Sequence, residues 1–285
     1  NGIGVAGVDW NAKIMSVRVL GCSGGTDYDI AQGILYAAGL ENDSNQTVAR
    51  ADVINMSLGG PYADQVTADA IAKAVDAGVI VIAAAGNEST SIPSYPAAYD
   101  GVISVSATDR DNQLAGFSNY GSKIDIAAPG VEIMSTFVSS ENNTVIHDYR
   151  SLSGTSMAAP HVAGVASLMK SVYSDMTPDD FDAILISGNI TNDLGDTGRD
   201  DNFGFGLIDA KKAVEYATQI NDGSVQIPVT PVLGLSDSSI DFATVQAEAV
   251  ITASNIGSKS STVTITNIVI ANSFVSVVSP TNSDG

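Results

Sequence analysis

Apolar runs of strand length alternate with helical patterns from the start of the chain to about residue 219. The run Val79–Ala85 is almost entirely apolar, and it follows an Ala-rich helical stretch that Gly78 closes. A strand without polar alternation is buried on both of its faces, and helices are the usual cover. Repetition of this unit predicts an α/β fold with a mainly parallel sheet and helices on both faces.

The elements of this fold follow from the periodicity of the apolar residues. Strands are predicted at Lys13–Leu20, Asp52–Met56, Val79–Ala85, Val102–Ala107 and Val131–Thr136. Helices are predicted at Tyr28–Ala38, Ala63–Ala77, Ser156–Tyr173, Thr177–Ser187 and Asp209–Thr218. In the fourth helix Thr177 is a suitable cap, because Pro178 then opens the first turn.

The pattern changes after Asn221. Residues 220–232 contain Pro228 and Pro231 and are predicted to be a linker. From residue 233 no helical period is present, and four segments alternate like half-buried strands: Ser239–Thr244, Ala247–Ala253, Ser261–Ile270 and Phe274–Val278. We therefore predict an α/β domain over residues 1–219 and a partial all-β Ig-like sandwich over residues 233–285.

Charge and composition narrow the range of partners. The chain has 12 Lys and Arg against 32 Asp and Glu, a net charge of −20 and a pI near 4.1. This argues against nucleic acid as a partner, because binding to phosphate backbones needs a basic face. No apolar stretch approaches the length of a membrane span. Cys22 is the only cysteine, so no disulfide can form within the chain. Separately, we expect the protein to be a monomer.

The strongest motif is the run Gly154–Gly164, which reads Gly-Thr-Ser-Met-Ala-Ala-Pro-His-Val-Ala-Gly. A glycine turn delivers Ser156 to the first turn of a helix, where unsatisfied N–H groups and the positive end of the dipole converge. Such a place suits a nucleophile whose attack creates an oxyanion. The alternative is that Ser156 only caps an Ala-rich helix, and the residues alone leave both interpretations open.

Three further segments place polar or bare backbone groups beside strand ends. Asn87 follows the Val79–Ala85 strand at the edge where ligands gather in α/β sheets, although an Asn after Gly86 is also a common turn residue. Ser57-Leu58-Gly59 and Gly24-Gly25 offer bare backbone suited to pairing with an extended peptide. Taken alone, either glycine segment is simply a loop.

The run Gly154–Gly164 resembles the nucleophile motif of the subtilisin-like serine proteases, or subtilases, and Ala83–Asn87 resembles the strand that carries their side-chain oxyanion donor. The resemblance covers residues 1 to about 219. It implies a secreted, extracellular serine endopeptidase that hydrolyses peptide bonds through an acyl-enzyme and a Ser-His-Asp triad. By this resemblance Ser156 is the nucleophile, Asn87 is the oxyanion donor, and His161 is structural and not the base.

The resemblance also implies a cleft for a polypeptide substrate. The segments at Gly24, Gly25 and at Ser57, Leu58, Gly59 would clamp its backbone, with Gly86 beside them and Tyr28 near a distal side-chain pocket. Tyr95–Pro96 resembles the pair beside the family's first specificity pocket. We expect the peptide bond of this pair to be cis.

Calcium is the cofactor that the resemblance implies. Residues 1–8 are similar to the family's calcium loop, with Asn1, Ile3 and Val5 as ligands and the remaining ligands upstream. A second group of carboxylates is better interpreted as a solvated acidic loop; it comprises Asp193, Asp196, Asp200 and Asp201.

The base and the acid of the triad have no counterpart in the chain, whose histidines are His147 and His161. The chain order Asp, His, Ser places both missing groups before Asn1, so we expect a fragment that is inactive by itself. A dyad of His147 with Asp148 is disfavoured, because neighbours on an extended run point to opposite faces, and we expect a solvent-facing hairpin there. Two alternatives stay open: a catalytically inactive subtilase that binds peptides, and an adhesive β-sandwich protein.

Overall fold

The structure is a computed structural model that describes residues 4–22, 24–46, 48–141, 144–228, 233–235 and 253–255. The chain divides into two compact units, residues 1–230 and residues 231–285. In the described ranges no helix has the length and apolar character needed to cross a membrane.

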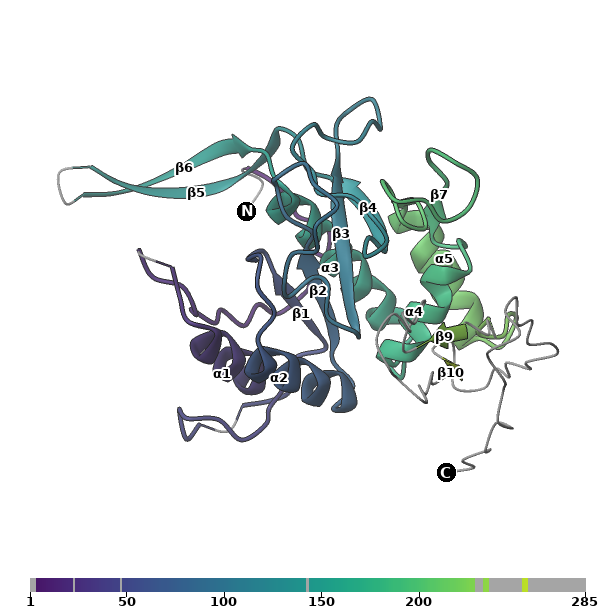
Figure 1. Cartoon of the computed structure of the whole chain (residues 1–285), viewed down its shortest axis with the longest axis horizontal. Helices are drawn as coiled ribbons and strands as arrows, with labels where there is room; N and C mark the ends of the chain where they lie inside the picture. Colours follow the sequence, from purple (N-terminus) through teal and green to yellow (C-terminus); the bar gives the residue numbers. More distant parts are fainter. Residues whose placement is uncertain are drawn as a thin grey trace, which may run out of the picture. The chain divides into compact units, whose positions relative to one another are not determined.

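A six-stranded sheet forms the centre of the first unit, in the order β1-β2-β3-β4-β8-β7 (Figure 1). Its strands are β1 (Val53–Met56), β2 (Ile80–Ala84), β3 (Val102–Thr108), β4 (Ile126–Pro129), β8 (Leu207–Ile208) and β7 (Thr191–Asn192). Neighbouring strands run parallel from β1 to β8, and only β7 pairs antiparallel with β8. The prediction of a mainly parallel α/β fold is confirmed.

Among the described residues, five helices surround this sheet: α1 (Asp27–Ala37), α2 (Gln65–Asp76), α3 (Thr155–Val172), α4 (Pro178–Ile186) and α5 (Ala210–Asn221). Four of them begin with a side chain that accepts N–H groups of the first turn, as Thr177 does in a capping box with Asp180. Helix α3 differs, because its cap is Gly154 and no side chain of the cap residue bonds to its first turn. The N-terminus of α3 is therefore open to other partners.

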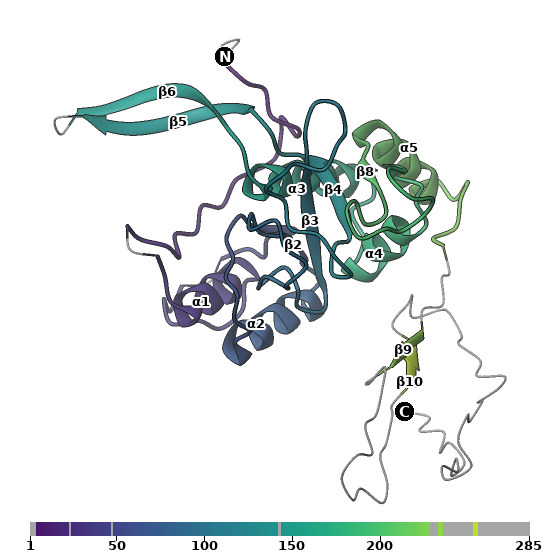
Figure 2. The ribbon, with the colours of Figure 1, turned by 45° about the horizontal axis from the view of Figure 1, so that its top comes forward.

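Successive side chains along β2 point to opposite faces of the sheet, which explains why helices cover both faces. Ile80 and Ile82 point into a core built with α3, α4 and α5, whereas Val79 and Val81 lie in a second core with α1 and α2. All four side chains are at most 1% exposed. Burial of such a side chain contributes about 1.5–3 kcal/mol, so each face stabilises its own layer of helices. Figures 1 and 2 show these two layers on either side of the strands.

One strand prediction is wrong, and another is right only in part. Lys13–Leu20 is not a strand: its backbone has no strand assignment, and Ile14 is 86% exposed. Its apolar residues favour an extended backbone, but a strand also needs a hydrogen-bonded neighbour. In Val131–Thr136 a strand is present from Ile133 onward, but it belongs to a separate two-stranded sheet and not to the central sheet. The place beside β3 belongs to β4, a four-residue strand that the sequence analysis did not predict.

Residues after β4 form a long antiparallel hairpin of β5 (Ile133–Glu141) and β6 (Thr144–Leu152). Figure 1 shows it extending from the body of the first unit, and most side chains of β6 are exposed. His147 lies on β6 opposite Val138, and Asp148 lies opposite Phe137. The predicted solvent-facing hairpin at His147 is confirmed.

The second unit is described at two short strands. β9 (Leu233–Leu235) pairs antiparallel with β10 (Ala253–Asn255). The predicted strands Ser239–Thr244, Ser261–Ile270 and Phe274–Val278 lie outside the described residues, as does Ala247–Ala253 except for its last residue. The Ig-like sandwich stays a prediction.

Candidate active site

The C-terminal ends of β1 and β2 meet the N-terminus of α3 at one edge of the sheet. Ser57 follows β1, Asn87 follows β2 after a short turn, and Ser156 is the second residue of α3. Parallel strands bring their carboxyl ends to the same edge, which is where α/β folds place their ligands. The sheet topology therefore gathers residues that are far apart in the sequence.

Ser156 is held at this edge through its own carbonyl group. In a regular helix that carbonyl would accept the N–H of residue 160, but Pro160 has no N–H to donate. The hydroxyl of Ser57 donates to the Ser156 carbonyl instead, at 2.8 Å, and Asn55 donates to the Ser57 hydroxyl at 3.0 Å. Pro160 thus leaves an acceptor free, and Ser57 satisfies it.

Asn87 is anchored to the same helix start by its side-chain oxygen. The oxygen Oδ1 accepts the N–H of Thr155 at 2.8 Å and the hydroxyl of Thr155 at 3.0 Å. Because a backbone N–H can only donate, this contact fixes which end of the amide faces α3. The amide NH₂ of Asn87 is thereby turned away from Thr155 and is available as a donor.

One backbone donor of the first turn of α3 stays free beside it. Thr155 gives its N–H to Asn87, while the N–H groups of Met157 and Ala158 both contact the carbonyl of Gly154. Within the described residues no acceptor faces the N–H of Ser156. A free backbone N–H and an oriented amide next to a serine hydroxyl form an arrangement that suits a developing oxyanion.

The Ser156 hydroxyl is half-buried and points to the carbonyl oxygen of Ser57 at 3.4 Å. Neither histidine is its partner. Nδ1 of His161 contacts the Met157 carbonyl at 2.9 Å within α3, and His147 is exposed on β6. The described residues therefore place a serine hydroxyl near a free N–H group and an oriented amide, but they place no imidazole against the serine.

The segment Ser57–Gly59 leads into Gly60, which lies beside Tyr95. Gly60 exchanges two backbone hydrogen bonds of 2.8 Å with Tyr95. A Cβ at Gly59 would lie 2.9 Å from the Ser94 hydroxyl oxygen and 3.2 Å from the Tyr95 carbonyl oxygen, so a side chain there would require these neighbours to shift. The peptide bond between Tyr95 and Pro96 is cis, which confirms that prediction.

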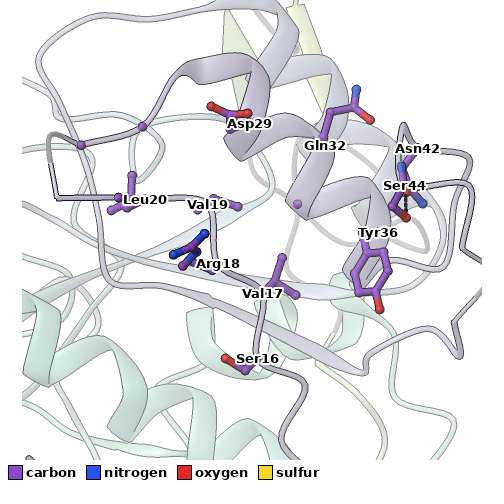
Figure 3. Close-up of a pocket in the computed structure, with 14 residues that line it drawn as sticks. Ser16, Val17, Arg18, Val19, Leu20, Asp29, Gln32, Tyr36, Asn42 and Ser44 are labelled. Carbon is purple, nitrogen blue, oxygen red and sulfur yellow. Dashed lines mark hydrogen bonds between the residues drawn. The ribbon is translucent and has the colours of Figure 1, made fainter. Parts of the chain in front are cut away.

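Gly24, Gly25 and Tyr28 lie at the start of α1, beside a hollow of about 550 Å³ that Gly24 and Gly25 line. Figure 3 shows the extended segment Ser16–Leu20 running along α1 at this hollow. The Tyr28 hydroxyl donates to Asp43, and this hydrogen bond raises the pKa of the phenol. In the part of the chain that the structure describes, no hydrogen bond connects these residues to Ser57–Gly59.

The described residues hold no group of three His, Cys, Asp or Glu side chains able to bind a metal ion. Of the predicted calcium ligands only Val5 lies among them, whereas Asn1 and Ile3 lie outside. The acidic loop is ordered by its own backbone: Asp200 accepts the N–H groups of Asn202 and Phe203.

Two residues that contact the oxyanion side of the site were missed by the sequence analysis. Thr155 donates twice to Asn87, and the buried Asn119 bonds to the turn that carries Asn87. Thr155 lies inside the nucleophile motif, where its neighbour Ser156 draws attention first. Nothing in the sequence separates Asn119 from an ordinary loop asparagine.

The fold and the site define a class: α/β proteins that present a serine at the open N-terminus of a buried helix, beside an asparagine at a strand end. A sequence profile of the subtilase family, peptidase S8, matches residues 1–206. The chain belongs to the subtilase family.

Individual relatives agree with this assignment. The chain is 40% identical over 223 residues to an extracellular basic protease of Dichelobacter nodosus, covering 75% of this chain and 36% of that protein. It is 39% identical over 214 residues to an alkaline protease of Alkalihalobacillus alcalophilus, covering 75% of this chain and 51% of that protein. Among solved structures it is similar to a protease of Pseudoalteromonas arctica, with a TM-score of 0.71, 42% identity and coverage of 76% of this chain and 66% of the other. The chain thus spans about half or less of the two curated relatives named here.

Proposed function

We propose that the protein to which this chain belongs is a secreted serine endopeptidase that hydrolyses peptide bonds of polypeptide substrates through an acyl-enzyme. Membership of the subtilase family and the relatives named as extracellular and alkaline proteases support this proposal. The observation that best supports it is the contact between the Asn87 side-chain oxygen and the N–H of Thr155, the residue before Ser156.

In the proposed reaction the Ser156 hydroxyl attacks the scissile carbonyl and gives its proton to a histidine. The N–H of Ser156 and the amide NH₂ of Asn87 donate to the oxyanion of the tetrahedral intermediate. The same histidine then protonates the leaving amine, and water hydrolyses the acyl-enzyme. The substrate backbone pairs with Ser57–Gly59, and Gly24, Gly25, Tyr28, Gly86, Tyr95 and Pro96 complete the proposed cleft.

We propose that the general base is a histidine outside these 285 residues. His161 already contacts its own helix, and His147 projects from a hairpin strand into solvent. Adjacent residues of a strand face opposite sides, so Asp148 is badly placed to orient His147. An orienting carboxylate would come from outside the chain in the same way.

Calcium remains a proposal that rests on the resemblance of residues 1–8 to the family's calcium loop. An asparagine side chain and the carbonyls of Ile3 and Val5 are hard oxygen donors of the kind that calcium prefers. No catalytic step depends on this ion, whose expected contribution is to stability.

The nucleophile can be tested by labelling the full-length protein with a fluorophosphonate and locating the adduct by mass spectrometry. We expect one labelled serine, Ser156, because activation requires the oxyanion donors as well as a base. Ser156→Ala should abolish both the label and the hydrolysis of a peptide substrate. An adduct on another serine, or hydrolysis that survives Ser156→Ala, would overturn the assignment. Peptide binding without label or hydrolysis would favour the alternative of a catalytically inactive subtilase.

A further inference from the structure

The turn that carries Asn87 is bonded to one buried side-chain amide, that of Asn119. Asn119 is 3% exposed and lies in the loop between β3 and β4. Its own backbone N–H donates to the Gly86 carbonyl at 3.0 Å. The residue therefore lies against the Ala85–Thr90 turn.

The Asn119 side chain uses both ends of its amide on this turn. Its oxygen accepts the N–H groups of Glu88 at 2.9 Å and Thr90 at 3.3 Å. Its nitrogen donates to the Ala85 carbonyl at 3.0 Å and to the Glu88 carboxylate at 2.9 Å. An amide has two donor hydrogens and two acceptor lone pairs, so all of its capacity is committed here.

Gly86 shows how closely the Asn119 side chain approaches the Ala85–Thr90 turn. It has φ +107°, a backbone conformation that side-chain-bearing residues rarely adopt, and a Cβ there would overlap the Asn119 amide. The Glu88 carboxylate that Asn119 holds also accepts the N–H of Asn87 at 2.9 Å. The backbone on both sides of Asn87 is thus tied, directly or through Glu88, to Asn119.

We infer that Asn119 is a positioning residue for the oxyanion donor: it fixes the Ala85–Thr90 turn so that the Asn87 amide bonds to Thr155 with its oxygen and presents its NH₂ to the oxyanion. This inference rests on the proposed function. Asn119 reaches no reacting atom itself. It acts through Asn87, so its loss should lower kcat and leave KM near the wild-type value.

The kinetic test uses the full-length protein and a double-mutant cycle. Asn119→Asp keeps the shape of the side chain but replaces two donors by acceptors that face the Ala85 carbonyl and the Glu88 carboxylate. A misplacement of about 1 Å can cost about 100-fold in rate, and we expect a fall in kcat of about that size. Asn87→Ala should lower kcat by about 10²–10³. The double variant should be as active as Asn87→Ala alone, because Asn119 has no other route to the reaction.

Two outcomes of this cycle have different meanings. If the losses of Asn119→Asp and Asn87→Ala multiply in the double variant, Asn119 does not act through Asn87 and the inference is wrong. If Asn87→Ala leaves kcat unchanged, the oxyanion assignment of the proposed function fails first, and the inference falls with it. Ile184→Val in the core of α4 is the matched control: it should lower Tm without changing kcat, in either background.

A measurement independent of catalysis tests whether the hydrogen bonds of Asn119 hold the Ala85–Thr90 turn in place. Amide hydrogen exchange at Glu88 and Thr90 should become faster in Asn119→Ala, because their N–H groups lose the acceptor oxygen. The amide of Ser104, which donates to Asp125 at 2.8 Å, should be unaffected and serves as the internal control. Unchanged exchange at Glu88 and Thr90 would overturn the inference that Asn119 fixes this turn, even if the protein proved to be an active protease.

Discussion

At the scale of single residues, the position of Ser156 depends on a hydrogen bond that the helix itself does not supply. Pro160 removes the donor that would bond to the Ser156 carbonyl, and the hydroxyl of Ser57 takes its place at 2.8 Å. Ser57 also lies on the proposed substrate strand. This hydrogen bond therefore joins the segment after β1 to the start of α3 at Ser156.

We predict that substitutions at Ser57 and Pro160 are coupled. Ser57→Ala should lower the free energy of unfolding by about 1 kcal/mol, the usual net value of a hydrogen bond. Pro160→Ala restores a backbone donor to the Ser156 carbonyl, so it should stabilise the Ser57→Ala variant more than it stabilises the wild type. Urea unfolding of the four proteins of the cycle measures this difference.

The control for this cycle is Ser171→Ala, which removes a hydroxyl bonded to the Leu168 carbonyl farther along the same helix. Its effect should add to that of Pro160→Ala. Equal stabilisation by Pro160→Ala in the presence and absence of the Ser57 hydroxyl would contradict the contact between Ser57 and Ser156.

At the scale of elements, strand β4 is anchored by the residue before it. Asp125 accepts the N–H of Ser104 with its carboxylate at 2.8 Å, and its own N–H donates to the Ser104 carbonyl at 3.1 Å. Part of the residue reaches the surface, but its carboxyl group is surrounded by protein, and the loss of hydration raises its pKa to about 7. Burial acts in the same direction on Asp182, raising its pKa to about 6.

These shifts predict a pH dependence of stability. With a pKa raised from 3.8 to about 7, the folded protein binds more protons at Asp125 than the unfolded chain does between about pH 4 and 7. The contribution of this group to the free energy of unfolding is therefore present below pH 4 and lost as the pH rises to 7. Asp125→Asn should remove this decline, since the amide oxygen can still accept the Ser104 N–H and no charge forms.

Urea unfolding of the full-length protein at pH 5 and pH 7 tests this prediction. The exposed Asp111→Asn is the matched control, and it should leave the difference between the two pH values as in the wild type. Asp182 should still contribute its own smaller decline in Asp125→Asn, because its pKa is raised to about 6. A pH difference in Asp125→Asn as large as that of the wild type would show that the carboxyl group of Asp125 is ionised in the folded state at both pH values.

At the scale of the whole molecule, the proposed reaction needs a general base that accepts the proton of Ser156. Serine has a high pKa and is a poor nucleophile without a base in hydrogen-bonding distance. An oxyanion hole and binding site alone leave roughly 10³–10⁴ over the reaction in water, well below a complete triad. We predict that residues 1–285 by themselves lack appreciable peptidase activity, and that His147→Gln in the full-length protein retains the wild-type kcat.

Peptidase assays of both proteins decide the matter, with circular dichroism to show that residues 1–285 fold. A His147→Gln variant with full activity needs no circular dichroism, because its activity shows that it is folded. Activity of residues 1–285 equal to that of the full-length protein would place the base within this chain. A large loss of kcat in His147→Gln would make the hairpin histidine the first suspect.

Much of the fold was readable from local pattern. The five described helices occur where the apolar period predicted them, because each has its own apolar face and four of them have a side-chain cap, as Thr177 and Asp64 show. The apolar runs that became β1, β2 and β3 were also found. Ser156 and Asn87 stood out because a motif surrounds each of them. All of these features depend on residues within a few positions of one another.

The tertiary structure decided what depends on partners distant in sequence. Lys13–Leu20 has strand composition but no strand, and the short β4 became a strand because β3 and β8 lie beside it. Ser57 contacts Ser156 across 99 residues, and Asn119 bonds to Glu88 across 31. No local pattern encodes such contacts, because a hydroxyl or an amide has the same propensities wherever its partner lies. Only the packing of the sheet edge against α3 brings these groups within hydrogen-bonding distance.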